Sequence, residues 1–180
     1  QPSLVIDEQK AETLAIICAR LEGMPLAIEL IATRLNVLSV QQVASRLDNL
    51  LRLLQSSAET RSPRHQALHA ALEWSYQLLS PAQQELFAVL SVFAGNFTLD
   101  DIAAVAAIDP AEALDLLDVL ARKSLLVVEW QDDMAHYRLL DPVRQYAAAV
   151  LARSPRAEEV NARHAAQYIA LATQSQLRGP

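Results

Sequence analysis

Glycine is scarce in this chain: only three of its 180 residues are glycine, at positions 23, 95 and 179. A phosphate-binding loop of the form G-x-x-x-x-G-K-[ST] needs closely spaced glycines, and the sequence contains no such segment. No predicted strand ends in paired acidic residues that could hold a magnesium ion. We therefore predict that the chain does not hydrolyse nucleotide by itself and carries no catalytic residues.

Cysteine, aromatic residues and long apolar runs are also rare. The single cysteine, Cys18, excludes a disulfide framework, and its apolar helical surroundings predict a buried, unreactive thiol in a reducing compartment. Aromatic residues make up 5% of a sequence that is 52% hydrophobic, so helix formers outweigh strand formers. Since no leader opens the sequence and no apolar run reaches about 20 residues, we expect a cytoplasmic protein without a membrane span.

Basic residues are few in the middle of the chain. The formal net charge is −6, and residues 70–150 carry 12 acidic and 4 basic side chains, whereas residues 1–69 carry 7 of each. A surface that binds nucleic acid needs a concentration of lysine and arginine. The middle of the chain is therefore not expected to bind phosphates.

Local signals predict three helices in the first part of the chain. The first helix begins at an N-cap residue, the second begins at a proline after a glycine that ends the first, and the third begins with a capping box. The residues concerned are, in order, Asp7, Gly23 with Pro25, and Ser39 with Gln42. The second helix is apolar on nearly every side, so we expect it to be buried. The polar run from Gln55 to Arg64 predicts a domain linker.

The remaining signals predict helices, a hairpin and further helices. The helices begin near His65, Ser80-Pro81, Thr98, Asp109-Pro110, Asp141-Pro142 and Ser154-Pro155, and the hairpin strands are 125–130 and 135–140. Gly95 is expected to end the helix that begins at Ser80-Pro81. Three helices, a hairpin and a helix form the winged-helix arrangement. The predicted fold is mainly α: a helical bundle, a winged-helix domain with a small β-hairpin, and a C-terminal helix that begins a helical-repeat arm.

Three segments resemble motifs of one family. Residues 23–30 (GMPLAIEL) are similar to a G-x-P motif, residues 72–79 (LEWSYQLL) to the opening of a winged-helix domain, and residues 137–147 (YRLLDPVRQYA) to a segment that holds an M-H-D motif. The family is the STAND-class NTPases of the NB-ARC type, in particular bacterial regulators described as predicted ATPases. The resemblance implies a helical subdomain at 1–62, a winged helix at 63–153 and the start of a helical arm at 154–180.

The resemblance also implies a nucleotide switch. In such proteins an upstream P-loop domain binds ADP or ATP, the G-x-P proline packs on the adenine, and the M-H-D histidine reaches the phosphates. Carried over by position, the nucleotide contacts are Gly23, Met24, Pro25 and Leu26, and the switch residues are Leu140 and Asp141. Leu140 stands in the histidine position and cannot donate a hydrogen bond to a phosphate. Asp141 is expected to act as the N-cap before Pro142.

Several of these residues also have plainer interpretations. The Gly23-Met24-Pro25-Leu26 segment can be a simple corner between helices. His65 and His69 have a spacing that can serve a metal, but no third ligand accompanies them, so we predict no metal site. His136 and His164 are expected to be packing residues. Ser75 lies near Glu73 and His69 in sequence, but no strand-to-helix elbow surrounds it, so we do not predict a hydrolase triad.

The predicted function is the regulatory lid or switch portion of a signal-transducing NTPase, in a bacterial transcriptional regulator. ADP/ATP would bind only together with the upstream domain, and the partners would be that domain in cis, a second copy, or proteins held by the helical arm. The alternative is a stand-alone adapter that binds proteins without nucleotide. Direct DNA binding is disfavoured, because the helix that would enter the major groove carries Glu112, Asp115 and Asp118 on one face.

Overall fold

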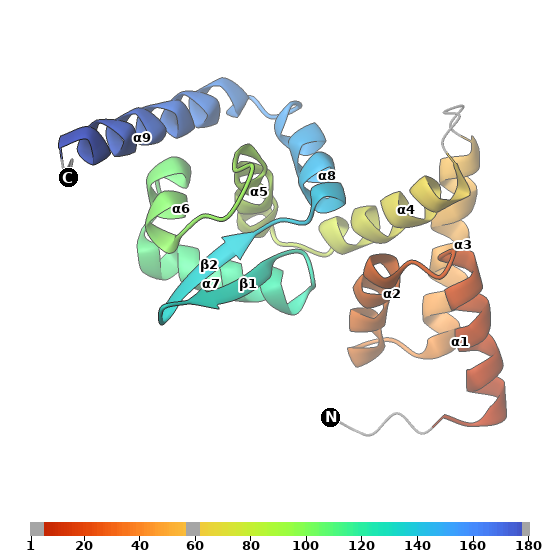
Figure 1. The fold of residues 1–180 in the computed structure, drawn as a ribbon. Coiled ribbons are helices and arrows are strands. Elements are labelled where there is room, and N and C mark those ends of the chain that lie inside the picture. Colours follow the sequence, from red (N-terminus) through yellow and green to blue (C-terminus); the bar gives the residue numbers. More distant parts are fainter. Residues whose placement is uncertain (1–5, 57–61, 178–180) are drawn as a thin grey trace. The chain divides into compact units, whose positions relative to one another are not determined.

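The computed structural model describes residues 6–56 and 62–177. The chain divides into two compact units, residues 1–78 and residues 79–180, which we call the N-terminal and C-terminal units (Figure 1). Each unit has its own hydrophobic core. The fold is mainly helical with one small antiparallel sheet, as predicted.

The N-terminal unit is a helical bundle. Its elements are α1 (Glu8–Arg20), α2 (Pro25–Ala32), the 3₁₀ helix η1 (Thr33–Asn36), α3 (Val40–Ser56) and α4 (Pro63–Gln77). Helix α1 packs on α3, and α4 packs on both α2 and α3. Leu21, Leu30 and Leu47 are completely buried in this core. Helix α2 is less buried than predicted, because Pro25 and Glu29 are exposed.

The predicted helix starts of the N-terminal unit are confirmed. Asp7 accepts a hydrogen bond from the Lys10 amide at 2.8 Å, which makes it the N-cap of α1. Ser39 and Gln42 form both hydrogen bonds of a capping box at the start of α3. The side chain of Cys18 is half-buried, which corrects the prediction of a buried thiol.

The boundary between the units lies one helix later than the sequence indicated. We expected it near Ser62, but the chain divides after Leu78. Helix α3 continues to Ser56, and α4 belongs to the N-terminal unit because it packs on α2 and α3. The centre of the predicted linker, residues 57–61, lies outside the described residues.

The C-terminal unit has the order of a winged helix. Its elements are α5 (Pro81–Val89), the 3₁₀ helix η2 (Leu90–Val92), α6 (Leu99–Ala106), α7 (Pro110–Arg122), β1 (Val127–Gln131), β2 (Met134–Arg138), α8 (Asp141–Leu151) and α9 (Ala157–Leu177). Helix α5 packs on α7 and α8, and α6 packs on α7. Figure 1 shows α9 lying over α6, which it contacts together with η2. Phe87, Phe93 and Phe97 fill the core.

An isolated β-bridge at Phe97 extends the wing beside β2. The amide of Phe97 donates to the carbonyl of Tyr137 at 3.0 Å, and the amide of Tyr137 donates to the carbonyl of Phe97 at 2.8 Å. The Phe97 and Tyr137 rings are also stacked, with centroids 6.4 Å apart. The sheet therefore runs from Phe97 through β2 to β1, and β1 is at its edge.

Capping explains most helix starts in the C-terminal unit. Ser80 with Gln83 and Thr98 with Asp101 form capping boxes, and Asp109 accepts from the amide of Ala111 at 2.8 Å. Helix ends or starts differ from the predictions at three residues, which are Gly95, Asp141 and Ser154.

Gly95 does not end its helix, because the chain already leaves helical geometry at Phe93, whose backbone is extended. Asp141 is not an N-cap: Leu140 holds that position without a side-chain hydrogen bond, and Asp141 is the first helical residue. The prediction placed the cap one residue late because Pro142 is also compatible with the second helical position. The last helix starts at Ala157, after a turn that Ser154 stabilises by accepting from the amide of Arg156 at 3.2 Å.

Candidate functional site

The predicted nucleotide-contact residues form a tight corner between α1 and α2. The amide of Glu22 donates to the carbonyl of Ala19, and the amide of Gly23 donates to the carbonyl of Cys18, both at 3.0 Å. This pair of hydrogen bonds is a Schellman motif. Both Glu22 and Gly23 have positive φ angles, 53° and 64°. The chain then becomes extended at Met24 and enters α2 at Pro25.

The corner presents its proline to the outside of the N-terminal unit. Gly23 and Pro25 are exposed, and Met24 and Leu26 are half-buried. Ala27 and Leu30, on the inner side of α2, are completely buried and fix the helix against its neighbours. The ring of Pro25 is therefore held rigidly at a surface, where it can contact another molecule or domain.

The predicted switch residues lie at the start of α8. Leu139 is buried, Leu140 is half-buried, and the side chain of Asp141 is 82% exposed and 3.9 Å from Arg144. The carbonyl of Leu140 accepts from the amide of Arg144 at 2.8 Å, which closes the first turn of α8. Gly23 to Leu26 thus lie together in the N-terminal unit, and Leu140 and Asp141 lie together in the C-terminal unit.

Helices α6 and α7 form the helix-turn-helix, and the outer face of α7 is acidic. Ala107 adopts a left-handed conformation that ends α6, and Asp109 caps α7. Ala113, Leu117 and Leu120 point into the core, whereas Glu112, Asp115 and Asp118 are exposed, as predicted. Leu114, between these acids, is 49% exposed.

The basic residues at the end of α7 do little to offset these acids. Arg122 forms an ion pair with Asp118, and Lys123 is half-buried. In a helix-turn-helix the second helix is the one that enters the major groove of DNA. The face that would meet phosphates here therefore carries three carboxylates and one arginine that is already paired.

The hairpin closes with a two-residue turn in which Asp132 and Asp133 have φ angles of 48° and 62°. Two consecutive left-handed residues make this a type I′ turn, which matches the twist of the strands. Glu129 and Arg138 form a cross-strand ion pair at 2.7 Å. Trp130 and Met134, beside the turn, are 73% and 57% exposed. Sequence reasoning missed this exposed apolar pair, although its position directly beside a polar turn is a usable signal.

Ser75 and His164 have structural roles. Ser75 is completely buried, and its hydroxyl accepts a hydrogen bond from the Nη2 atom of Arg34 at 3.1 Å. Burial lowers the pKa of Arg34, which is 4% exposed. His164 packs edge-on against Phe93, with ring centroids 5.2 Å apart. Burial lowers the pKa of His164, and nearby Asp101 raises it by less.

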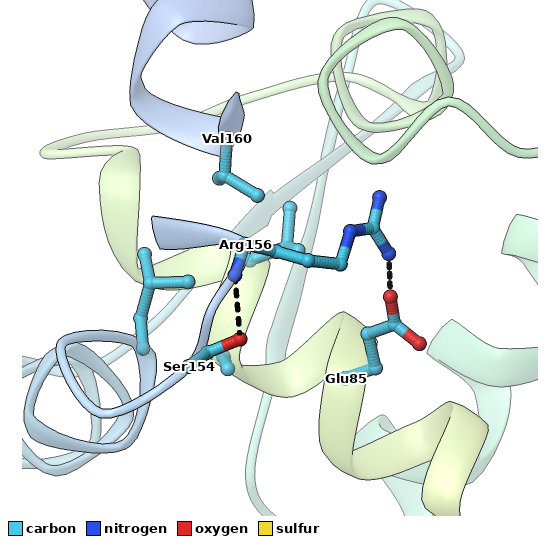
Figure 2. Close-up of a pocket in the computed structure, with 7 residues that line it drawn as sticks. Glu85, Ser154, Arg156 and Val160 are labelled. Carbon is cyan, nitrogen blue, oxygen red and sulfur yellow. Dashed lines mark hydrogen bonds and ion pairs between the residues drawn. The ribbon is translucent and has the colours of Figure 1, made fainter. Parts of the chain in front are cut away.

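A small pocket lies where α9 joins the winged helix. Arg156 and Glu85 form an ion pair at its rim, and Val160 closes it from α9 (Figure 2). Its volume is about 30 Å³, room for about one or two water molecules and not for a nucleotide. The pocket is thus a junction between α9 and the body of the C-terminal unit.

The described residues hold neither a cluster of metal ligands nor a helix that could cross a membrane. Within residues 6–56 and 62–177, no three histidine, cysteine, aspartate or glutamate side chains are grouped so that they could hold a metal ion. None of the helices in these ranges has both the length and the apolar character needed to cross a bilayer.

Comparison with known proteins supports the winged helix. Residues 79–152 match a family model described as "Winged helix-turn-helix domain". The match begins at the first residue of the C-terminal unit.

Two mycobacterial proteins are similar over most of the chain. "Putative HTH-type transcriptional regulator Rv0890c" of Mycobacterium tuberculosis (strain ATCC 25618 / H37Rv) is 41% identical over 175 residues, which cover 96% of this chain and 20% of that protein. "Uncharacterized protein Rv0894" of the same strain is 40% identical over 163 residues, 88% of this chain and 42% of that protein. The chain therefore spans about a fifth and about two fifths of the lengths of these relatives.

Proposed function

We propose that this chain is the regulatory lid or switch portion of a signal-transducing NTPase, within a cytoplasmic bacterial transcriptional regulator. Its winged helix would contact protein, in cis or in a second copy, and would not read DNA. The relatives named as HTH-type regulators support the regulatory class. The NTPase part of the proposal rests on the resemblance of residues 23–30, 72–79 and 137–147 to the NB-ARC motifs.

The observation that carries the proposal is the charge on α7. Binding to duplex DNA depends on neutralising phosphates with lysine and arginine, and this charge neutralisation supplies almost all of the non-specific affinity. The exposed side of α7 instead carries Glu112, Asp115 and Asp118. A winged helix with this acidic face is suited to bind a protein surface that carries complementary basic patches.

The exposed corner at Pro25 supports the nucleotide part of the proposal. A proline ring fixed at the start of α2 can cover an adenine base that a separate P-loop domain holds by its phosphates. In the resting state, the corner and the winged helix would close over ADP, and exchange for ATP would release them and expose surface for self-assembly. Such a switch requires that the two nucleotides stabilise the two arrangements to different extents. With Leu140 in the histidine position, the phosphates would be sensed by residues outside this chain.

The test is the nucleotide content of the purified full-length protein, measured by chromatography after denaturation. We expect near-stoichiometric ADP in the unchanged protein and a clear loss in Pro25→Ala. Pro81→Ala is the matched control, because Pro81 is also an exposed proline in the first turn of a helix. It should retain the ADP. Nucleotide-free protein in all three cases would overturn the switch, and equal ADP in all three would remove Pro25 from the pocket.

A protein adapter that works without nucleotide is the second candidate. The observation that favours it is Leu140, since a leucine side chain cannot sense a phosphate. The exposed apolar residues Leu114 and Trp130 are surface that such an adapter could use. Nucleotide-free full-length protein in the experiment above is the result that would favour the adapter.

A further inference from the structure

The outer edge of the wing has an open row of backbone hydrogen-bonding groups. The type I′ turn makes Gln131 and Met134, which flank it, a hydrogen-bonded pair. Hydrogen-bonded and non-hydrogen-bonded pairs alternate along an antiparallel ladder. The pairs Trp130 with Ala135 and Val128 with Tyr137 are therefore non-hydrogen-bonded pairs. The N–H and C=O groups of Val128 and Trp130 consequently point away from β2.

The other side of the hairpin confirms this assignment. The same alternation predicts that the N–H and C=O of Tyr137 point away from β1. Both groups are found in hydrogen bonds with Phe97, at 2.8 Å and 3.0 Å, on the far side of β2. The register and the turn type therefore place the outward groups of both strands consistently.

The edge of β1 is accessible. Val128 is 36% exposed and Trp130 is 73% exposed. Within the described residues, no backbone hydrogen bond outside the hairpin ladder involves Val128 or Trp130. Natural proteins usually protect such edges, since an open strand edge is a template for another strand. This edge instead carries an exposed tryptophan.

We propose that β1 accepts an extended segment of a partner protein as an additional strand of the wing. The segment would pair with the four backbone groups of Val128 and Trp130, and one of its apolar side chains would cover the indole of Trp130. Binding by strand addition derives affinity from main-chain hydrogen bonds and specificity from alternate side chains. The proposal concerns a protein contact that does not depend on nucleotide, so it goes beyond the proposed switch.

Charge indicates the chemistry of the partner segment. The turn at the end of β1 carries Asp132 and Asp133, both exposed, whereas Glu129 of β1 is already paired with Arg138. Residues 70–150 have 12 acidic side chains against 4 basic ones. A segment in which apolar residues alternate with lysine or arginine matches this surface, with a basic residue beside the turn.

A second copy of this chain is a poorer occupant. Pairing two β1 edges through their outward groups, with Val128 opposite Trp130 of the other copy, places the two Glu129 side chains directly opposite each other. Like charges at such a position destabilise a strand pair, although each Glu129 is also paired with Arg138 of its own copy.

The experiment is backbone amide hydrogen exchange, followed by NMR, on this 180-residue chain. The probes are synthetic heptapeptides in which valine, isoleucine or threonine alternates with lysine or arginine, and a matched set with glutamate in the charged positions. In the free chain, the amides of Val128 and Trp130 should exchange rapidly, and that of Glu129, which points to β2, slowly. We expect basic peptides to slow exchange at Val128 and Trp130 by at least about tenfold and glutamate peptides to leave it unchanged.

Variants separate strand addition from other binding. Trp130→Pro removes an outward N–H without removing a hydrogen bond to β2, and it should abolish peptide protection at Val128. Trp130→Ala disturbs the folded structure less, and it should weaken peptide protection at Val128 several-fold. Met134→Ala is the control, because Met134 is exposed at the same turn on the other strand, and it should bind as the unchanged chain does. Replacing Asp132 and Asp133 by asparagine should weaken binding of basic peptides and reduce its salt dependence.

Three results would overturn the proposal. They are no protection at Val128 and Trp130 with any basic peptide, equal protection with the glutamate peptides, and protection that rises with protein concentration in the absence of peptide. The last result would assign the edge to self-association.

Discussion

At the scale of single residues, two neighbours at the end of α1 show how backbone conformation selects a side chain. Glu22 and Gly23 both have left-handed backbones, and they complete the Schellman motif that turns the chain toward Pro25. A side chain in this conformation costs energy, whereas glycine adopts it freely. A Cβ atom at Gly23 would meet nothing within 4 Å, so the backbone angle alone favours glycine there.

Substitutions at these two positions should act in opposite directions. We expect Gly23→Ala to lower the free energy of unfolding of the N-terminal unit by about 1 kcal/mol, because it adds a left-handed alanine. Glu22→Gly should raise it by about 0.5 kcal/mol, because it relieves the same strain and glycine is the preferred residue at this position of the motif. Urea denaturation of the two variants and the unchanged chain measures both effects. Equal destabilisation by both changes would contradict this account.

At the scale of elements, α9 packs on α6 and η2, and one of its packing residues, His164, can titrate. Val160 is completely buried, and His164 packs between Phe93 and Tyr168. Gln167 lies 3.5 Å from a carboxylate oxygen of Asp101. Docking of α9 therefore depends on keeping the His164 ring uncharged against aromatic neighbours.

Stability of this docking should fall in mild acid. Burial lowers the pKa of His164 in the folded state, and the charge of Asp101 offsets this only in part. The unfolded state therefore binds a proton more readily. The contribution of His164 is full above its unfolded pKa of about 6.5 and is lost as the pH falls from there through the lower pKa of the folded state. We expect the protection factors of α9 amides, which correct for the intrinsic slowing of exchange in acid, to fall between pH 7 and pH 5 relative to those of α5.

His164→Gln provides the control, because it removes the titrating ring and leaves His65, His69 and His136 in place. The variant should show a flatter dependence of α9 exchange on pH. An equally steep dependence in the variant would show that another group is responsible.

The elements also show what the sequence could predict. Helix starts at Asp7, Ser39, Ser80, Thr98 and Asp109 were predicted because capping involves residues two or three apart, which the sequence displays directly. The placement of α4 in the N-terminal unit was not predicted, because it results from tertiary packing against α2 and α3, which no local sequence signal displays.

The candidate sites likewise differ in whether local sequence signals could predict them. The acidic face of α7 could be predicted, since helical periodicity alone places Glu112, Asp115 and Asp118 together on one side. The open edge of β1 could not, because it depends on the register of the hairpin and on the bridge from Phe97 to Tyr137. Whether Pro25 meets a nucleotide stays a prediction.

At the scale of the whole molecule, a fold that commonly binds DNA is combined with an acidic surface. The C-terminal unit has the winged helix-turn-helix arrangement, which is widely used to bind DNA. The helix that would enter the groove is acidic, and the chain as a whole has a formal charge of −6. We infer that the fold is used here for protein contacts within a regulator, through α7 and the edge of β1.

The most direct test of this central claim is a titration of random duplex DNA with the 180-residue chain at low salt, followed by gel shift. The comparison is a variant in which Glu112, Asp115 and Asp118 are all replaced by lysine, which raises the formal charge from −6 to 0. Circular dichroism would show that both proteins are folded. We predict no complex with the unchanged chain at micromolar concentration and a salt-sensitive complex with the variant, because phosphate contacts dominate non-specific affinity. Micromolar or tighter binding of duplex DNA by the unchanged chain would contradict the account.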